Sequence, residues 1–269
     1  MAGPEDTYTH GHHDSVLRSH RWRTVENSAG YLLPHLQPGV ELLDVGCGPG
    51  TITIDLAARL APGRVVGLDA APDAIAAAQA AATEAGAGNL TMQVGDVYAL
   101  DIADASFDVV HAHQVLQHLG NPVAALGEMR RVCRPGGVVA ARDSIYRAMS
   151  WYPREPGMER WLEIYCSVAE ANGGEPDAGS HLLAWATAAG FDDVRCTATA
   201  WCYATPQERA WWGDLWAERT EATALAHRAV ELGASTREEL AEVAGAWRRW
   251  AAQPDAWFAV PCGEILATA

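Results

Sequence analysis

This chain of 269 residues has few basic residues, and it contains neither a long apolar run nor a recognisable export signal. Its 19 basic residues stand against 34 acidic ones, and the formal net charge of −15 disfavours a surface that binds nucleic acid by neutralising phosphates. No run of about 18 uninterrupted apolar residues exists, so we expect no membrane-spanning helix. Residues 1–6 are acidic and lack the apolar segment of a signal peptide. We therefore expect a cytoplasmic protein with neither a nucleic-acid partner nor a membrane span.

Cysteine pairs and phenylalanine are also scarce. The six cysteines include no C-x-x-C pair, which is typical of reduced thiols and predicts no metal site. Only 3 Phe stand beside 11 Trp, but apolar residues reach 49% of the chain, which is enough for a packed core. The length allows one large α/β domain or a domain with a cap, and it leaves open whether the protein is a homodimer.

From residue 40 onwards, short apolar runs alternate with segments of helical periodicity. We expect strands over 40–45, 64–69, 90–94, 107–112, 137–142, 194–199 and 256–261, and helices over 51–60, 72–85, 122–132 and 181–189. One or two helices are expected within 15–36, and 146–179 and 206–252 are expected to be mainly helical. Strands that alternate with helices pair in parallel through right-handed crossovers, so the pattern predicts a doubly wound sheet.

A glycine-rich loop follows the first predicted strand. Residues 43–51 read Leu-Asp-Val-Gly-Cys-Gly-Pro-Gly-Thr and lead into a predicted helix. Glycines let the backbone turn tightly against a ligand, and the first turn of the helix offers unpaired N–H groups. Taken alone, this pattern is also typical of an ordinary strand-to-helix turn.

Polar residues at three further strand ends make a ligand site the better interpretation. Asp69 ends the second strand, Asp96 and Val97 follow the third, and His113 and Gln114 follow the fourth. In an open α/β sheet the carboxyl ends of the strands meet at one crevice, so these residues are expected to face one ligand. There, Asp69 can accept hydrogen bonds from both hydroxyls of a ribose, and Asp96 from the amino group of an adenine.

Two adenosyl ligands compete for this pattern. The NAD fingerprint places its third glycine three residues after the second, but that position is Thr51, and Gly50 comes one residue early. Asp44 adds a negative charge to the loop, which suits an ammonium group better than a pyrophosphate. S-adenosylmethionine carries an ammonium, a sulfonium, a ribose and an adenine without a phosphate. The acids therefore favour S-adenosylmethionine, with an NAD-dependent oxidoreductase as the alternative.

Residues 40–144 also resemble a known family, the class I S-adenosylmethionine-dependent methyltransferases, and in particular their type-11 (ubiquinone/menaquinone-biosynthesis-like) group. The matching stretches are residues 42–50, 66–69, 95–97, 106–110 and 132–137. The resemblance implies an α/β, Rossmann-like, doubly wound sheet of seven strands with helical cap elements. It also implies that the seventh strand, near 256–261, runs antiparallel between strands five and six.

The same resemblance implies roles for individual residues. Asp44 and the backbone of Gly46, Cys47, Gly48 and Gly50 would hold the methionine end, Asp69 with Ala70 the ribose, Asp96 and Val97 the adenine, and the carbonyl of His113, next to Gln114, the ammonium. The family often has a small polar residue where this chain has Ala70, which leaves only a backbone contact there. We divide the chain into N-terminal lid helices (1–39), a cofactor-binding core (40–145), a helical insertion (146–180), a core continuation (181–205), a helical cap (206–252) and a last core strand (253–269).

Methyl transfer needs alignment of donor and acceptor, and a base where the acceptor must lose a proton. The candidate bases are His113, His118 and the N-terminal His10, His12 and His13, with His118 and His13 preferred. The apolar turn around His118 also suits a packing histidine. Residues 10–13 are interpreted as a lid, a metal tract or a disordered tip, and Tyr8 belongs to the lid hypothesis. Arg23 is interpreted as surface polarity.

Tryptophans of the predicted cap indicate the type of acceptor. Trp211, Trp212 and Trp216, together with Trp151 and Trp161, form either the roof of an apolar acceptor pocket or a seam that docks the cap on the core. We expect methyl transfer to an O, N or C atom of a small, partly apolar metabolite, quinone-like or secondary. The alternative from another class is a protein that binds the cofactor without transferring methyl, as a regulator or a cyclase-like enzyme.

Overall fold

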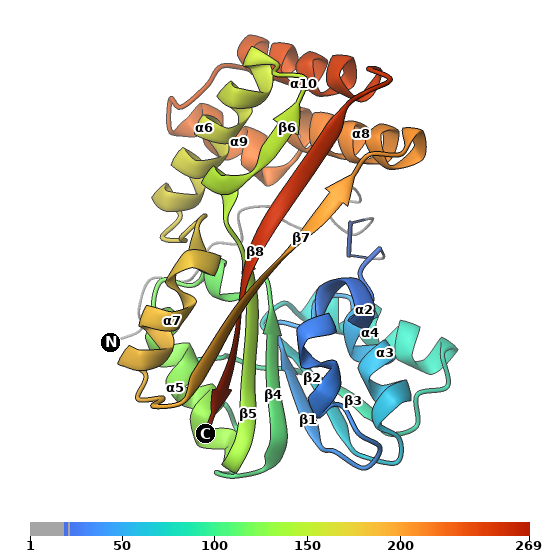
Figure 1. The fold of residues 1–269 in the computed structure, drawn as a ribbon, viewed down its shortest axis with the longest axis vertical. Coiled ribbons are helices and arrows are strands. Elements are labelled where there is room, and N and C mark those ends of the chain that lie inside the picture. The colour runs from blue at the N-terminus through green and yellow to red at the C-terminus, as the bar shows by residue number, and fades with distance from the viewer. Residues whose placement is uncertain (1–18, 21) are drawn as a thin grey trace.

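The computed structural model describes residues 19, 20 and 22–269. Figure 1 shows a lower half built around a sheet and an upper half made mostly of helices, with two long strands running from one half into the other. These strands are β7 (Val194–Tyr203) and β8 (Trp257–Thr268). They make the two halves share one sheet.

The sheet contains eight strands within the described residues. Seven follow the order β3-β2-β1-β4-β5-β8-β6, and the eighth, β7, lies off this path and pairs with β8. The strands not yet given are β1 (Leu42–Val45), β2 (Val65–Asp69), β3 (Leu90–Val94), β4 (Phe107–His113), β5 (Cys133–Ser144) and β6 (Ser150–Tyr152). β1 to β5 pair in parallel, and β8 pairs antiparallel with both β5 and β7. The predicted fold class is therefore confirmed, including an antiparallel last strand between the fifth strand and the strand before it in sequence.

Two details of the predicted sheet are wrong. The three residues of β6 pair with the start of β8 and add an eighth strand, in a segment that we expected to be helical. The last two strands are also longer than expected, because they continue beyond the lower core and pack against helices of the upper half. There the buried side chains of Trp201, Tyr203 and Phe258 belong to the upper apolar core.

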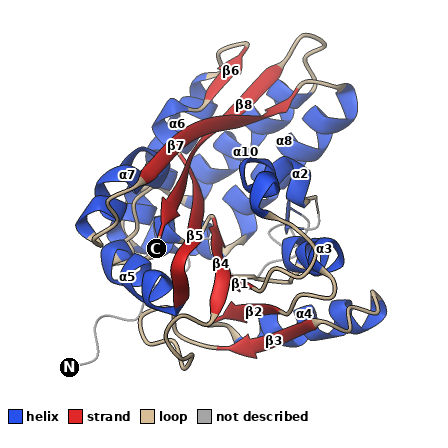
Figure 2. Ribbon diagram, turned by 60° about the horizontal axis from the view of Figure 1, so that its bottom comes forward, coloured by secondary structure: helices blue, strands red, loops and turns tan. Residues whose placement is uncertain are grey.

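Helices cover both faces of the lower sheet (Figure 2). On one side lie α2 (Val25–Ser28), η1 (Gly30–His35), α3 (Thr51–Leu60) and α4 (Pro72–Glu84), and on the other α5 (Pro122–Val132) and α7 (Ala178–Ala188). Of the one or two helices expected within 15–36, the described part contains the helical residues 19–20, the single turn α2 and the 3-10 segment η1, which holds Pro34. Proline removes an N–H donor from a helix interior, which limits regular α-helix there.

The upper half consists of α6 (Pro156–Ala171), α8 (Pro206–Ala222), α9 (Ala224–Glu231) and α10 (Arg237–Ala251), together with β6 and the upper ends of β7 and β8. Its centre is an aromatic cluster in which the Trp161 ring lies 4.5 Å from that of Trp216 and 4.9 Å from that of Trp247. Two 3-10 turns, η2 (Leu116–His118) and η3 (Tyr146–Ala148), lie at the junction of the halves.

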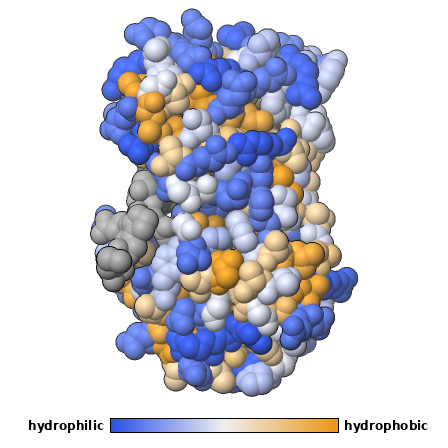
Figure 3. Space-filling view, turned by 90° about the vertical axis from the view of Figure 1, so that its left-hand side faces the viewer, coloured by the Kyte–Doolittle hydropathy of each residue, from blue (hydrophilic) through white to orange (hydrophobic). Residues whose placement is uncertain are grey.

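Many polar side chains lie on the outer surface. The side shown in Figure 3 is mainly hydrophilic, with only small hydrophobic areas between polar ones. In the part of the chain that the structure describes, no helix is both long and apolar enough to cross a membrane.

Candidate active site

A cavity of about 440 Å³ lies between the two halves, at the carboxyl ends of β1, β2 and β4. The predicted site residues that line it are Asp44, Gly46, Cys47, Gly48, Asp69, Ala70, Asp96, Val97, His113, Gln114, His118, Trp211 and Trp212. Gly50 lies behind the loop, where a Cβ would stand 2.8 Å from Cε of Met92. Tyr8 and His13 lie outside the described residues.

The glycine loop has a backbone that only glycine adopts without strain. Gly46 and Gly48 have φ angles of +68° and +53°. A Cβ on Gly46 would also lie 2.3 Å from Cγ2 of Val115, so both conformation and space require glycine there. The N–H groups of Gly46 and Cys47 donate to the carbonyl of Leu68, which ties the loop to the end of β2.

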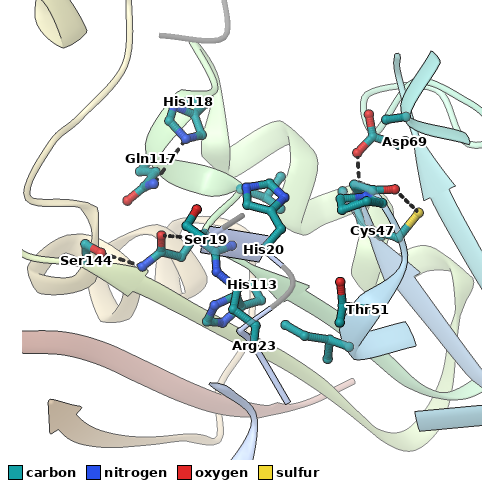
Figure 4. A pocket seen from close by; sticks show the side chains of 18 of the residues that line it. Ser19, His20, Arg23, Cys47, Thr51, Asp69, His113, Gln117, His118 and Ser144 are labelled. Atoms are coloured by element: carbon teal, nitrogen blue, oxygen red, sulfur yellow. Dashed lines mark hydrogen bonds between the residues drawn. The ribbon is translucent and has the colours of Figure 1, made fainter. Parts of the chain in front are cut away.

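Asp69 is held firmly at the edge of this loop (Figure 4). Its Oδ2 accepts a hydrogen bond from the backbone N–H of Gly48, and its Oδ1 accepts one from Ala71, both at 2.9 Å. A carboxylate oxygen can accept more than one hydrogen bond. Asp69 can therefore still accept from two hydroxyls while its own position is fixed.

Asp44 is buried beneath the loop and is held from two sides. Oγ1 of Thr53 donates to its Oδ2 at 2.6 Å, and Nδ1 of His111 lies 2.8 Å from its Oδ1. Its carboxylate thus places negative charge under the glycines. Asp96 is exposed by comparison, and its Oδ1 accepts from the N–H of Tyr98 at 2.9 Å.

The other end of the cavity is formed by β4 and β5. Gln114, with a φ of +56°, donates from Nε2 to Oγ of Ser144 at 2.5 Å and accepts from Nη2 of Arg23 at 3.2 Å. Arg23 therefore lines the cavity, and its interpretation as surface polarity is wrong. The residues around Arg23 in the sequence do not indicate this role, because its hydrogen bond to Gln114 joins positions 91 residues apart.

Two histidines that line this end of the cavity, His113 and His118, have lowered pKa values. Burial, aided by the guanidinium groups of Arg23 and Arg142, holds the pKa of His113 well below its usual range. Burial, with a smaller effect of Arg23, lowers the pKa of His118 to about 3. Both rings are therefore uncharged at neutral pH, with one nitrogen that carries hydrogen and one that can accept a hydrogen bond. Nε2 of His118 lies 3.1 Å from Nε2 of Gln117.

Five aromatic side chains, which we call the aromatic wall, close the cavity toward the upper half: Trp22, Trp201, Tyr203, Trp211 and Trp212. Adjacent rings in this wall have centroids 4.2–5.8 Å apart. By contrast, Trp151 and Trp161 pack in the upper core. Trp212 and Trp216 line the cavity and are also members of the upper core, so they belong to both sets.

Sequence reasoning missed three residues of the wall. Trp201 and Tyr203 lie at the end of β7, and extending the predicted strand by four residues would have placed them at the same sheet edge as the acids. Trp22 comes from the N-terminal segment, and its position against Trp201, at 5.5 Å, depends on tertiary packing.

The charges around the cavity fit a cationic adenosyl compound. Among the described lining residues, all three acids come from the ends of β1 to β3, and those strand ends contribute no lysine or arginine. A dinucleotide would bring a pyrophosphate toward Asp44 and Asp69. S-adenosylmethionine would bring an ammonium and a sulfonium instead, so the donor and acceptor set matches it better.

Comparisons with known proteins agree with this fit. A family model described as a methyltransferase domain matches residues 36–208. An uncharacterized methyltransferase of Schizosaccharomyces pombe is 31% identical over 99% of this chain and 98% of its own length. The YcgJ protein of Bacillus subtilis superposes with a TM-score of 0.60 at 17% identity, over 90% of this chain and 98% of that one. A Haemonchus contortus phosphoethanolamine N-methyltransferase, solved with S-adenosylhomocysteine, superposes with a TM-score of 0.54 at 16% identity, over 88% of this chain and 51% of that one.

Proposed function

Because the chain belongs to the class I S-adenosylmethionine-dependent methyltransferases, we propose that it methylates an O, N or C atom of a small, partly apolar metabolite, either quinone-like or secondary. The observation that carries this proposal is the division of one cavity into two unlike ends. Asp44, Asp69 and Asp96 lie at one end, and the aromatic wall closes the other. The volume of about 440 Å³ is in the range of small-molecule sites.

The acidic end is assigned to the cofactor, which supplies a methyl group on a positively charged sulfur. The assignments are Asp44 and the backbone of Gly46, Cys47, Gly48 and Gly50 for the methionine end, Asp69 beside Ala70 for the ribose, Asp96 and Val97 for the adenine, and the carbonyl of His113, next to Gln114, for the ammonium. The fixed carboxylate of Asp69 supports the ribose assignment, because an acceptor that is already oriented loses little entropy when it binds.

The aromatic end is assigned to the acceptor, with Trp211 and Trp212 as contacts. Aromatic side chains exclude water and present flat apolar surface, which suits alignment of a partly apolar molecule for in-line displacement. His118 is proposed as a base because its neutral ring lines the cavity, although a pKa of about 3 makes it a weak proton acceptor. We keep His13 as a second candidate base and Tyr8 as a substrate contact from the N-terminal lid.

The function is tested by incubating the protein with S-adenosylmethionine carrying an isotope-labelled methyl group and a metabolite extract. We expect label in a small product that partitions into organic solvent. The Asp69→Ala variant should form little of it, whereas Asp73→Ala, which changes an exposed acid at the start of α4, should form as much as the wild type. Cofactor binding without any labelled product would favour the non-transferring alternative instead.

A further inference from the structure

His113 is a buried polar side chain whose hydrogen bonds are not made inside the protein. It lies on β4 with 6% of its surface exposed, and it lines the cavity. Among the described residues, neither Nδ1 nor Nε2 has a hydrogen-bond partner. Buried polar atoms without partners reduce stability and are uncommon in folded proteins, so this one requires an explanation.

His111 gives an internal comparison, because it lies two residues earlier on the same strand and therefore on the same face. Its Nδ1 lies 2.8 Å from a carboxylate oxygen of Asp44, so the protein itself fixes that ring, although Nε2 of His111 has no partner among the described residues. The two rings are nearly parallel, with centroids 6.4 Å apart. Similar rings in one strand thus have different surroundings, and only the ring of His113 opens on the cavity.

The surface next to His113 is aromatic and already holds cations of the protein. The Trp201 ring lies 5.6 Å from the His113 ring. Cζ of Arg23 and Cζ of Arg142 lie 5.5 and 4.5 Å from the centroid of the same Trp201 ring, and Cζ of Arg219 lies 5.1 Å from that of Trp216. A ring that already faces a guanidinium group offers little further attraction to an ammonium group.

A cationic acceptor would also find no carboxylate at this end. The acids among the described lining residues are Asp44, Asp69 and Asp96, which all belong to the cofactor end. An uncharged, flat acceptor needs neither a free aromatic face for a cation nor a carboxylate partner, since it can stack along the aromatic wall. Beside His113 and Trp201, the geometry therefore favours an uncharged acceptor over a cationic one.

We propose that the space between His113 and the aromatic wall binds an uncharged aromatic molecule whose hydroxyl donates its hydrogen to an imidazole nitrogen of His113. This rests on the proposed function, and it specifies oxygen as the methylated atom. The low pKa of His113 keeps the ring neutral, with one nitrogen able to accept. The hydroxyl oxygen bonds to the methyl carbon as the carbon–sulfur bond breaks with its electron pair left on sulfur. His113 orients the hydroxyl by accepting its hydrogen bond, and the hydroxyl proton is released to water.

The acceptor class is tested by calorimetry with two probes, 2-naphthol and 2-naphthylmethylamine, at neutral pH on protein saturated with S-adenosylhomocysteine. The first probe is an uncharged aromatic hydroxyl and the second an aromatic ammonium of similar shape. We expect 2-naphthol to bind about tenfold more tightly or better, which corresponds to one modest hydrogen bond. Equal or tighter binding of the amine, or no binding of 2-naphthol, would overturn the proposal. If S-adenosylhomocysteine itself did not bind, the proposed function would fail instead.

The role of the side chain is tested by His113→Phe, which keeps the ring shape and the backbone carbonyl but removes both nitrogens. We expect its Tm to rise by about 2–4 °C, because two unpartnered polar atoms disappear. Its affinity for 2-naphthol should fall about tenfold while its affinity for S-adenosylhomocysteine is unchanged. His113→Gln, which keeps a donor and an acceptor, should retain part of the naphthol affinity.

The matched control is His181→Phe, the same replacement at a half-exposed histidine on α7 outside the cavity. It should leave both affinities as in the wild type. A lower Tm for His113→Phe together with unchanged naphthol binding would identify His113 as a packing residue and would refute the proposal.

Discussion

The backbone N–H of Gly48 donates a 2.9 Å hydrogen bond to Oδ2 of Asp69. This bond joins the glycine loop after β1 to the end of β2, and Ala71 fixes the second oxygen of the same carboxylate. Asp69 thus has two tasks, which are to hold the loop in place and to present acceptor capacity to the cavity. Removing it affects both.

Asp69→Ala should weaken the binding of S-adenosylhomocysteine by about 1.5–3 kcal/mol, or about 10- to 150-fold, because two ribose hydroxyls lose a charged acceptor. Isothermal titration calorimetry measures this directly. Asp73→Ala, at an exposed acid a few residues further on, is the control and should bind normally. Unchanged affinity in Asp69→Ala would refute the ribose assignment.

Gly46→Ala should destabilise the protein by about 2–4 kcal/mol, from a positive φ and an overlap with Val115. Urea unfolding measures the loss. In a double-mutant cycle, Val115→Ala should recover the part due to overlap but not the part due to the backbone. Purely additive effects of Gly46→Ala and Val115→Ala would contradict a steric overlap between the new Cβ and the Val115 side chain.

His111→Phe should lower the free energy of unfolding by about 3 kcal/mol, because Asp44 keeps Thr53 but loses its histidine partner in a site where both side chains are almost fully buried. The same replacement at His113 should raise stability, because it removes two buried nitrogens that have no partner among the described residues. Parallel urea titrations of the two variants compare one chemical change at two positions of one strand. Similar losses in both would contradict the distinction between a paired and an unpartnered histidine.

Asp143 should give the protein an unusual dependence on pH. It is fully buried, and burial raises its pKa to about 8. Between pH of about 4 and 8 the folded state then binds a proton that the unfolded state does not bind, so stability falls as the pH rises, by at most about 1.4 kcal/mol per pH unit.

The slope is best measured by urea unfolding between pH 6.5 and 8, because the lowered pKa values of His113 and His118 act in the opposite direction below pH 6.5. Asp143→Asn keeps the oxygen that accepts from the N–H of Gln117 and should remove the downward slope. A slope that persists in this variant would assign the effect to another group.

Much of the lower half could be predicted from local pattern. The helices Thr51–Leu60 and Pro122–Val132 have the predicted bounds, because each begins and ends at strong local signals. The acids of the cavity were also found in the sequence, since the end of a parallel strand is a defined place in an open sheet. The upper half was harder: β6 has only three residues, and its pairing with β8 spans more than 100 residues of sequence.

The sequence by itself determined the order of strands and helices in the lower half, the glycine loop and the acids that follow the strands, because each depends on neighbours along the chain. Tertiary structure alone decided which histidine of the His-Ala-His segment 111–113 is paired. It also decided that Trp22, Trp201 and Trp211 meet in one wall, and that Arg23 reaches Gln114. The physical reason is that a hydrogen bond or ring contact depends on distance in space, and these partners come from segments that approach one another only when the sheet and the helices above it have packed.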